Sequence, residues 1–120
     1  MKVTKFALLA LMVTLLGGVL SSPAGAANLP TLKMLSTTTC PACAMMEPVL
    51  KDLADKYKGK VATEHVYLED HPDVAKQYNV RYVPTLIFID EKGNEVAQEV
   101  GYRSLDEVLA VFAQSGVKIK

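Results

Sequence analysis

The chain has 120 residues, half of them hydrophobic, and its 13 Lys and Arg balance 13 Asp and Glu. This length allows a single domain, and the apolar fraction excludes a mostly disordered chain. The balanced charge leaves no electrostatic footprint for nucleic acid, so we expect no nucleic-acid partner. Two cysteines are too few for a scaffold of several disulfides or for a four-cysteine metal site.

The first 26 residues have the pattern of a secretory signal peptide. Lys2 and Lys5 precede an uncharged apolar run at 6–20, and the small residues Ala-Gly-Ala at 24–26 suit a signal peptidase. The apolar run falls short of the roughly 20 residues that span a bilayer, which argues against an uncleaved anchor. We therefore expect a cleaved signal peptide at 1–26. The domain at 27–120 would then be periplasmic or otherwise exported, where thiols are not kept reduced by default.

The first half of this domain alternates strands and helices. Residues 31–35 form a short apolar segment that predicts a buried strand, and a long amphipathic helix is predicted after Cys40. Residues 61–68 alternate in polarity and predict a second strand. Asp70 is the expected cap of a short helix that has Pro72 in its first turn.

The second half predicts a hairpin followed by a helix. Residues 85–89 form a continuous apolar run typical of a strand inside a sheet. The turn at 90–94 leads to a strand at 95–100, so the two strands should form a hairpin. Ser104 and Glu107 make a capping box at the start of the last helix.

The order of elements is therefore β-α-β-α-β-β-α, which predicts an α/β fold with a four-stranded mixed β-sheet and helices on both faces. Strands that alternate with helices are expected to pair in parallel through right-handed crossovers. The hairpin would add an antiparallel edge.

The chemistry of the chain is concentrated in Cys40-Pro41-Ala42-Cys43, between the first strand and the long helix. At a helix N-terminus, unpaired N–H groups and the helix dipole favour a thiolate at Cys40. Cys43 lies one turn further in and should be more buried. Disulfide exchange needs this asymmetry, because one exposed sulfur attacks a substrate disulfide and a second sulfur resolves the mixed disulfide.

Three other interpretations of the pair compete with exchange. A purely structural disulfide gains little, because closing a four-residue loop contributes only about 2 kcal/mol. The pair could also belong to a docking module with an inert disulfide. A copper or zinc site would need further ligands, and the candidates are His65, His71, Met45 and Met46. At a strand-to-helix turn of an exported chain, Cys-x-x-Cys favours redox chemistry.

From Thr31 to Gly116 the chain resembles the thioredoxin family. Pro48 stands where the family's active-site helix carries a proline, and Val83-Pro84-Thr85 is similar to its cis-proline loop. The resemblance implies that Pro84 is cis and lies beside the cysteines. It also implies that the backbone of Val83 pairs with the substrate chain and that Gly101 lets this chain come near. No cofactor is implied, because the cysteine pair carries the electrons.

The chain also departs from the family's pattern. Thr39 replaces the usual tryptophan before the first cysteine, and Met34 replaces a buried acid that accepts a proton from the second cysteine. His65 occupies the neighbouring-strand position where a lysine often lies. Histidine ordinarily exchanges protons near neutral pH, so His65 could take over proton transfer, or it could be a structural strand residue.

The sequence thus predicts an exported thiol–disulfide oxidoreductase in which Cys40 is the nucleophile and Cys43 the resolving thiol. Its compact form favours a reductase that serves disulfide-bonded or thiol-containing client proteins and is supplied by a membrane thiol-redox partner. The Cys-Pro-x-Cys spacer and the valine before Pro84 also occur in oxidising relatives, so the direction of electron flow stays open. The alternative is a periplasmic copper chaperone that uses the same two cysteines. Small copper carriers normally end in a strand, however, and this chain is predicted to end in a helix.

Overall fold

The computed structural model describes residues 28–119. They form seven elements, in the predicted order: β1 (Thr31–Ser36), α1 (Pro41–Lys56), β2 (Ala62–Tyr67), α2 (Pro72–Gln77), β3 (Thr85–Ile89), β4 (Glu95–Val100) and α3 (Leu105–Gln114). The expected signal peptide at 1–26 lies outside the described residues. Within residues 28–119, no helix combines the length and the apolar character needed to cross a membrane.

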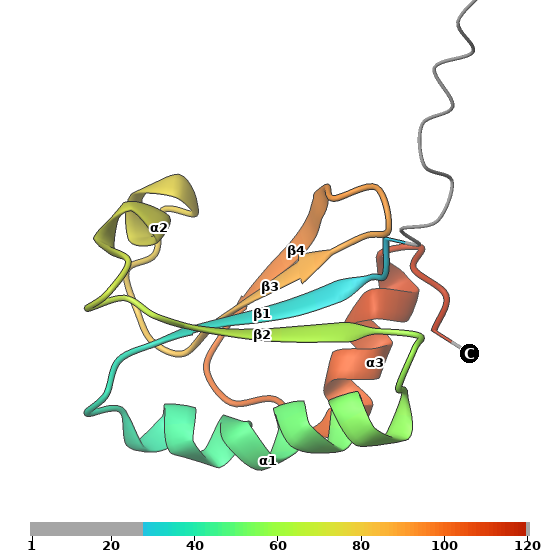
Figure 1. Ribbon diagram of the computed structural model, residues 1–120, viewed down its shortest axis with the longest axis horizontal. Coiled ribbons are helices and arrows are strands. Elements are labelled where there is room, and N and C mark those ends of the chain that lie inside the picture. Colours follow the sequence, from blue (N-terminus) through green and yellow to red (C-terminus); the bar gives the residue numbers. More distant parts are fainter. Residues whose placement is uncertain (1–27, 120) are drawn as a thin grey trace, which may run out of the picture.

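The four strands form one mixed sheet in the order β2-β1-β3-β4. β1 and β2 are parallel, as predicted, and β3 and β4 form the predicted antiparallel hairpin. The prediction that β3 runs parallel to β1 is wrong, because these strands are antiparallel, with Leu35 opposite Thr85. The reason is the length of α2, whose six residues extend only about 9 Å. It cannot carry the chain back along the sheet, and β3 therefore starts at the end where β2 finishes (Figure 1).

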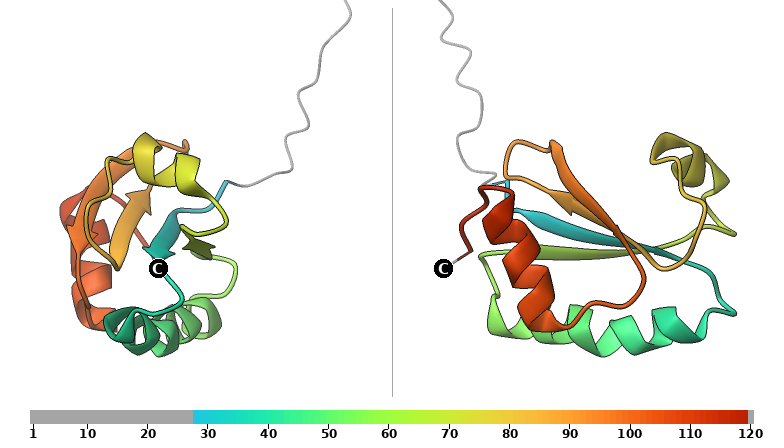
Figure 2. Two further views of the ribbon diagram at one scale, coloured as in Figure 1. Left: turned by 90° about the vertical axis from the view of Figure 1, so that its left-hand side faces the viewer. Right: turned by 180° about the vertical axis from the view of Figure 1, so that it is seen from behind.

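Helices cover both faces of the sheet, as predicted. α1 and α3 lie on one face and enclose the main core, in which the rings of Phe88 and Phe112 meet edge to face with centroids 4.9 Å apart. α2 lies near the other face, where Val74 packs against a smaller cluster of Leu35, Val66 and Ile87. Figure 2 shows this arrangement from the side and from behind.

The helix starts are only partly as predicted. The capping box of α3 is confirmed, since Glu107 N–H donates to the Ser104 hydroxyl and Ser104 N–H donates to the Glu107 carboxylate. The cap expected at Asp70 is wrong. His71 occupies the N-cap of α2, and within residues 28–119 its side chain makes no capping hydrogen bond. The backbone N–H groups of Asp70 and His71 both donate to the carbonyl of Tyr67, so a turn occupies these residues and the helix begins after them.

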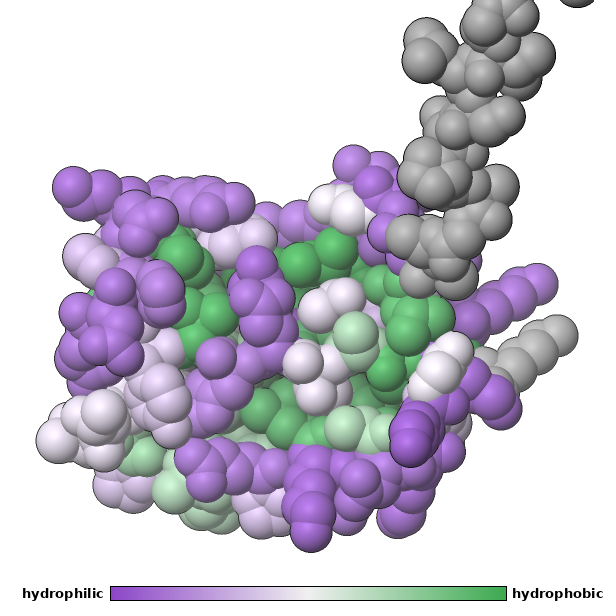
Figure 3. Space-filling view, in the orientation of Figure 1, coloured by the Kyte–Doolittle hydropathy of each residue, from purple (hydrophilic) through white to green (hydrophobic). Residues whose placement is uncertain are grey.

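The outer side of the second half of α1 is hydrophilic, and in Figure 3 the lower rim of the molecule is purple over its middle and right-hand part. Lys51, Asp52, Asp55 and Lys56 are exposed there, whereas Met46, Leu50 and Leu53 on the inner side are buried. Pro48 lies inside this helix, on the exposed side. The amphipathic pattern therefore fixes which side of α1 faces the sheet, and with it which way the first turn presents the cysteines.

Candidate active site

The two cysteines form a disulfide at the start of α1, with their Cα atoms 5.2 Å apart. Cys40 is the N-cap residue, and its sulfur accepts a hydrogen bond of 3.1 Å from the backbone N–H of Cys43. Cys40 is half-buried, whereas Cys43 is 3% exposed. The unequal exposure expected from the sequence is therefore present, and a helix N–H group points at the more accessible sulfur.

A carboxylate in the connection that follows β2 holds the loop before Cys40 in place. Glu69, just after β2, accepts hydrogen bonds from the backbone N–H of Thr38 at 2.8 Å and from its hydroxyl at 3.0 Å. Both bonds are to the ionised carboxylate, and the N–H bond contributes most to lowering the pKa of Glu69 below its usual 4.5. Glu69 thus ties the β2–α2 connection to the segment that leads into Cys40.

This lowered pKa makes part of the stability of the loop depend on pH. The carboxylate form is favoured in the folded chain, so its contribution is present at neutral pH and is lost as pH falls below about 4.5. Replacing Glu69 with glutamine should therefore reduce the loss of stability between pH 6 and pH 3, measured by urea unfolding at each pH. Glu91→Gln, at an exposed position in the β3–β4 turn, is the matched control and should leave the slope unchanged. Equal slopes for both variants would contradict the role of Glu69.

The loop predicted to dock substrates enters β3 from the same end of the sheet. The Val83–Pro84 peptide bond is cis, Pro84 is buried, and the carbonyl of Pro84 accepts a hydrogen bond of 2.8 Å from the N–H of Gly101. Gly101 has a φ of +94°, which favours glycine over residues with a side chain. Within residues 28–119, neither the N–H nor the carbonyl of Val83 makes a backbone hydrogen bond. Its main-chain groups are thus free to pair with another chain.

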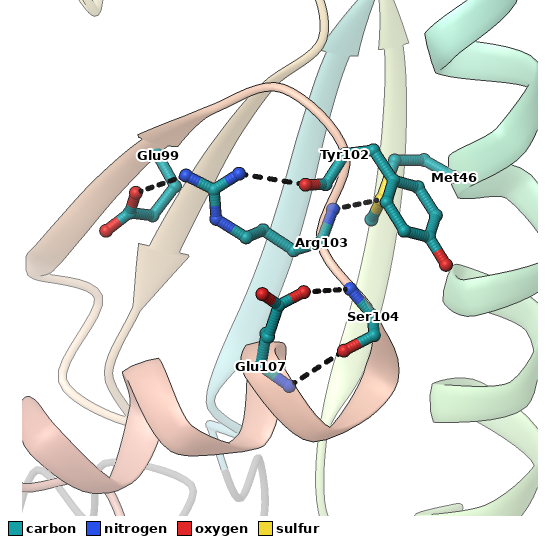
Figure 4. A network of polar contacts seen from close by, with 6 residues as sticks. All are labelled: Met46, Glu99, Tyr102, Arg103, Ser104 and Glu107. Atoms are coloured by element: carbon teal, nitrogen blue, oxygen red, sulfur yellow. Dashed lines mark hydrogen bonds and ion pairs between the residues drawn. The ribbon is translucent and has the colours of Figure 1, made fainter.

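A network after β4 ties the Gly101 loop to α1 (Figure 4). The backbone N–H of Arg103 donates to the sulfur of Met46 at 3.2 Å, and Met46 lies one turn after the cysteines. The guanidinium of Arg103 binds the Glu99 carboxylate at 3.0 Å and the Tyr102 carbonyl at 2.8 Å. The helix that carries the cysteine pair and the loop that carries Gly101 are therefore held together by direct contacts.

A small hollow of about 130 Å³ lies beside the disulfide. Cys40, Cys43 and His65 all line it, together with Ser36 at the end of β1 and Tyr67 on β2. The hydroxyl of Ser36, which is fully buried, is 2.5 Å from Nε2 of His65. The structure thus brings three of the predicted site residues together, and it links Pro84 to Gly101 in a second group.

Sequence reasoning missed two residues of this region, Ser36 and Glu69. Alternation along β1 places Ser36 on the same face as Met34, but only the register of β1 against β2, which the structure supplies, brings this face next to His65. Glu69 left no signal, since its contact with Thr38 joins two loops across 31 positions of the chain.

Comparison with known proteins agrees with the fold. The family model described as thioredoxin matches residues 26–114. Thioredoxin of Chlorobaculum thiosulfatiphilum is 36% identical over 61 residues, which cover 51% of this chain and 55% of that protein. Thioredoxin C-2 of Corynebacterium nephridii is 33% identical over 89 residues, which cover 74% of this chain and 82% of that protein. The chain thus spans only about half the length of the first of these relatives.

A solved structure described as "Structure of a malarial protein" matches with a TM-score of 0.68 and 21% identity, covering 75% of this chain and 100% of that one. At this identity it shows the fold alone. The mixed sheet and the disulfide-bonded Cys-x-x-Cys pair at a strand-to-helix turn agree with the match to the thioredoxin family model. The chain belongs to the thioredoxin family.

Proposed function

We propose that this chain is an exported thiol–disulfide oxidoreductase that reduces disulfide-bonded client proteins. The observation that carries the proposal is the unequal pair, with a half-buried Cys40 that accepts a helix N–H bond and a Cys43 that is 3% exposed. In the reduced enzyme, the Cys40 thiolate attacks a client disulfide and releases one client thiolate. The Cys43 sulfur then attacks Cys40, which releases the second client thiolate and restores the Cys40–Cys43 disulfide.

The loops around the pair supply the surface for a client chain. The free main-chain groups of Val83 are available to pair with an extended client segment, as in β-strand addition. Pro84 and Gly101, which are joined by a backbone hydrogen bond, add little side-chain bulk next to Val83. Tyr82 and Tyr102 are exposed on the same loops, at 70% and 41%, and offer apolar contact area next to it.

Export and the supply of electrons complete the proposal. The charged start, apolar run and small residues at 1–26 support secretion. Outside the cytoplasm no thiol pool reduces the pair by default, so a membrane thiol-redox partner must return two electrons to it after each turnover.

For the copper-chaperone alternative, residues 28–119 contain no group of three or more His, Cys, Asp or Glu side chains placed to hold a metal ion. We do not propose that alternative, because no contact among these residues favours it.

The reduction potential of the 27–120 protein tests the direction of electron flow. The protein is equilibrated in glutathione buffers of known potential, and free thiols are trapped by alkylation and counted by mass. We expect one reversible two-thiol transition below about −220 mV, the range of reductases. A value above about −180 mV would make the chain an oxidant or isomerase instead. Absence of any two-thiol transition would overturn exchange altogether, and cell fractionation of the full chain tests export.

A further inference from the structure

The hollow beside the disulfide contains a polar pair to which the exchange steps above assign no role. Ser36 is fully buried at the end of β1, and its hydroxyl is hydrogen-bonded to Nε2 of His65. Cys43 is 3% exposed and lines the same hollow. A buried hydroxyl and the buried Cys43 sulfur, which is a thiol once the disulfide is reduced, thus share a space that is large enough for water, beside an imidazole that is in contact with that hydroxyl.

Resolution of the mixed disulfide needs a proton acceptor at this place. Cys43 attacks as a thiolate, and burial disfavours the charged form of a thiol. The N–H bond at the helix N-terminus is directed to the Cys40 sulfur and not to the Cys43 sulfur. On the strand behind Cys43, the residue opposite His65 is Met34, which has no ionisable group. Among the ionisable side chains that line the hollow, His65 is the one that is hydrogen-bonded to the buried Ser36 hydroxyl.

We propose that Ser36 and His65 accept the proton of Cys43 in the resolving step. The Ser36 hydroxyl donates to Nε2 of the neutral imidazole. The Cys43 S–H bond breaks as its sulfur bonds to Cys40, and the proton moves to the Ser36 oxygen, directly or through water in the hollow. The Ser36 proton moves to Nε2, and the client sulfur leaves as a thiolate with the electron pair of the broken disulfide. The inference rests on the proposed function and names the base of its second step.

Other ionisable side chains lie near His65, and the experiment must distinguish their effect on the proton transfer from that of His65. Glu47 lies on the exposed side of α1 and lines both the hollow beside the disulfide and a shallower one next to His65. Glu64 is ion-paired with Lys33 at 3.6 Å, so its charge is already balanced. The remaining groups are Lys51 of α1 and Tyr67 of β2, whose ring lies 4.3 Å from the His65 ring.

The experiment measures the two chemical steps separately. Reduced 27–120 protein is mixed in a stopped-flow instrument with 5,5′-dithiobis(2-nitrobenzoic acid), an aromatic disulfide whose released thiolate absorbs light. The first release reports attack by Cys40 and the second reports resolution by Cys43. We expect His65→Gln and Ser36→Ala to keep the first rate and to slow the second by about tenfold or more at pH 7. The deficit should disappear above about pH 9.5, where a thiol ionises without a base.

Matched variants make the outcome decisive. Ser36→Thr keeps the hydroxyl and should retain most of the second rate, while Glu47→Gln and Tyr67→Phe should leave it unchanged. A second rate that is equal to wild type in Ser36→Ala and His65→Gln, or slowed equally at every pH, overturns the Ser36–His65 role and leaves disulfide exchange intact. A loss confined to Glu47→Gln assigns the proton to that carboxylate and likewise overturns it. If the wild-type protein itself gives no second release, the proposed function and this inference both fail.

Discussion

Replacing Cys40 with serine should lower insulin reduction by at least about 10³-fold, because a serine hydroxyl is not ionised at neutral pH and cannot replace the thiolate. Cys43→Ser should behave differently. Cys40 can still attack, but no second sulfur resolves the product, so the protein should accumulate as a mixed disulfide with its client. The measurement is turbidity of insulin reduction for activity, and mass spectrometry of the alkylated protein for the trapped adduct.

The difference between the two variants follows from the geometry. Cys40 is the more accessible sulfur and accepts the Cys43 N–H bond, whereas Cys43 is buried against the sheet. Ala42→Ser, between the cysteines, is the matched control and should exchange at a rate close to wild type. If Cys43→Ser lost activity without forming an adduct while Cys40→Ser formed one, the roles of the two sulfurs would be reversed. Full activity in Cys40→Ser would remove the pair from the mechanism.

The sequence was a good guide to individual elements and a poor one to their relative direction. Apolar runs and caps are local signals, so β3 was predicted at its observed bounds, and the capping box of Ser104 and Glu107 is present. The direction of β3 depends on how far the preceding connection travels in space. α2 is six residues long, too short to return the chain along the sheet, and helical periodicity does not reveal where such a short helix is placed.

In the candidate active site too, the sequence predicts residues that belong to a local motif and misses a residue whose contact depends on the arrangement of the strands. Cys40 and Cys43 are predicted from the sequence because two cysteines three positions apart at the start of a helix are typical of a redox-active pair. Their unequal burial follows from the same spacing. Ser36 was missed because a serine at a strand end carries no motif of its own. Its contact with His65 depends on the register of β1 against β2, which places Met34 opposite His65 and Ser36 opposite Tyr67. Sequence spacing does not contain this register.

Phe112→Ala should lower the free energy of unfolding by about 3–5 kcal/mol. Phe112 is 1% exposed and packs edge to face on Phe88 at 4.9 Å, in the core between the sheet and α3. The substitution removes an aromatic ring from close packing and leaves a cavity that the surrounding sheet cannot fill. For a domain of this size the loss should lower the melting temperature by roughly 12–40 °C, measured by circular dichroism together with urea unfolding.

Two variants on the same helix bracket this effect. Gln114 is exposed, so Gln114→Ala should change the free energy of unfolding by no more than about 0.5 kcal/mol. Phe112→Leu keeps most of the side-chain volume and should lower the free energy of unfolding by about 1–2 kcal/mol.

The effect of Phe112→Ala on function should be indirect. α3 starts directly after the Arg103 loop, which contacts Met46 on the cysteine helix, so loss of α3 packing weakens the support of the loop that carries Gly101 without touching either sulfur. Phe112→Ala protein that is still folded at 15 °C should therefore react with an alkylating agent at Cys40 at the wild-type rate. A slowed reaction would mean that α3 sets the reactivity of the thiol as well as the stability of the domain.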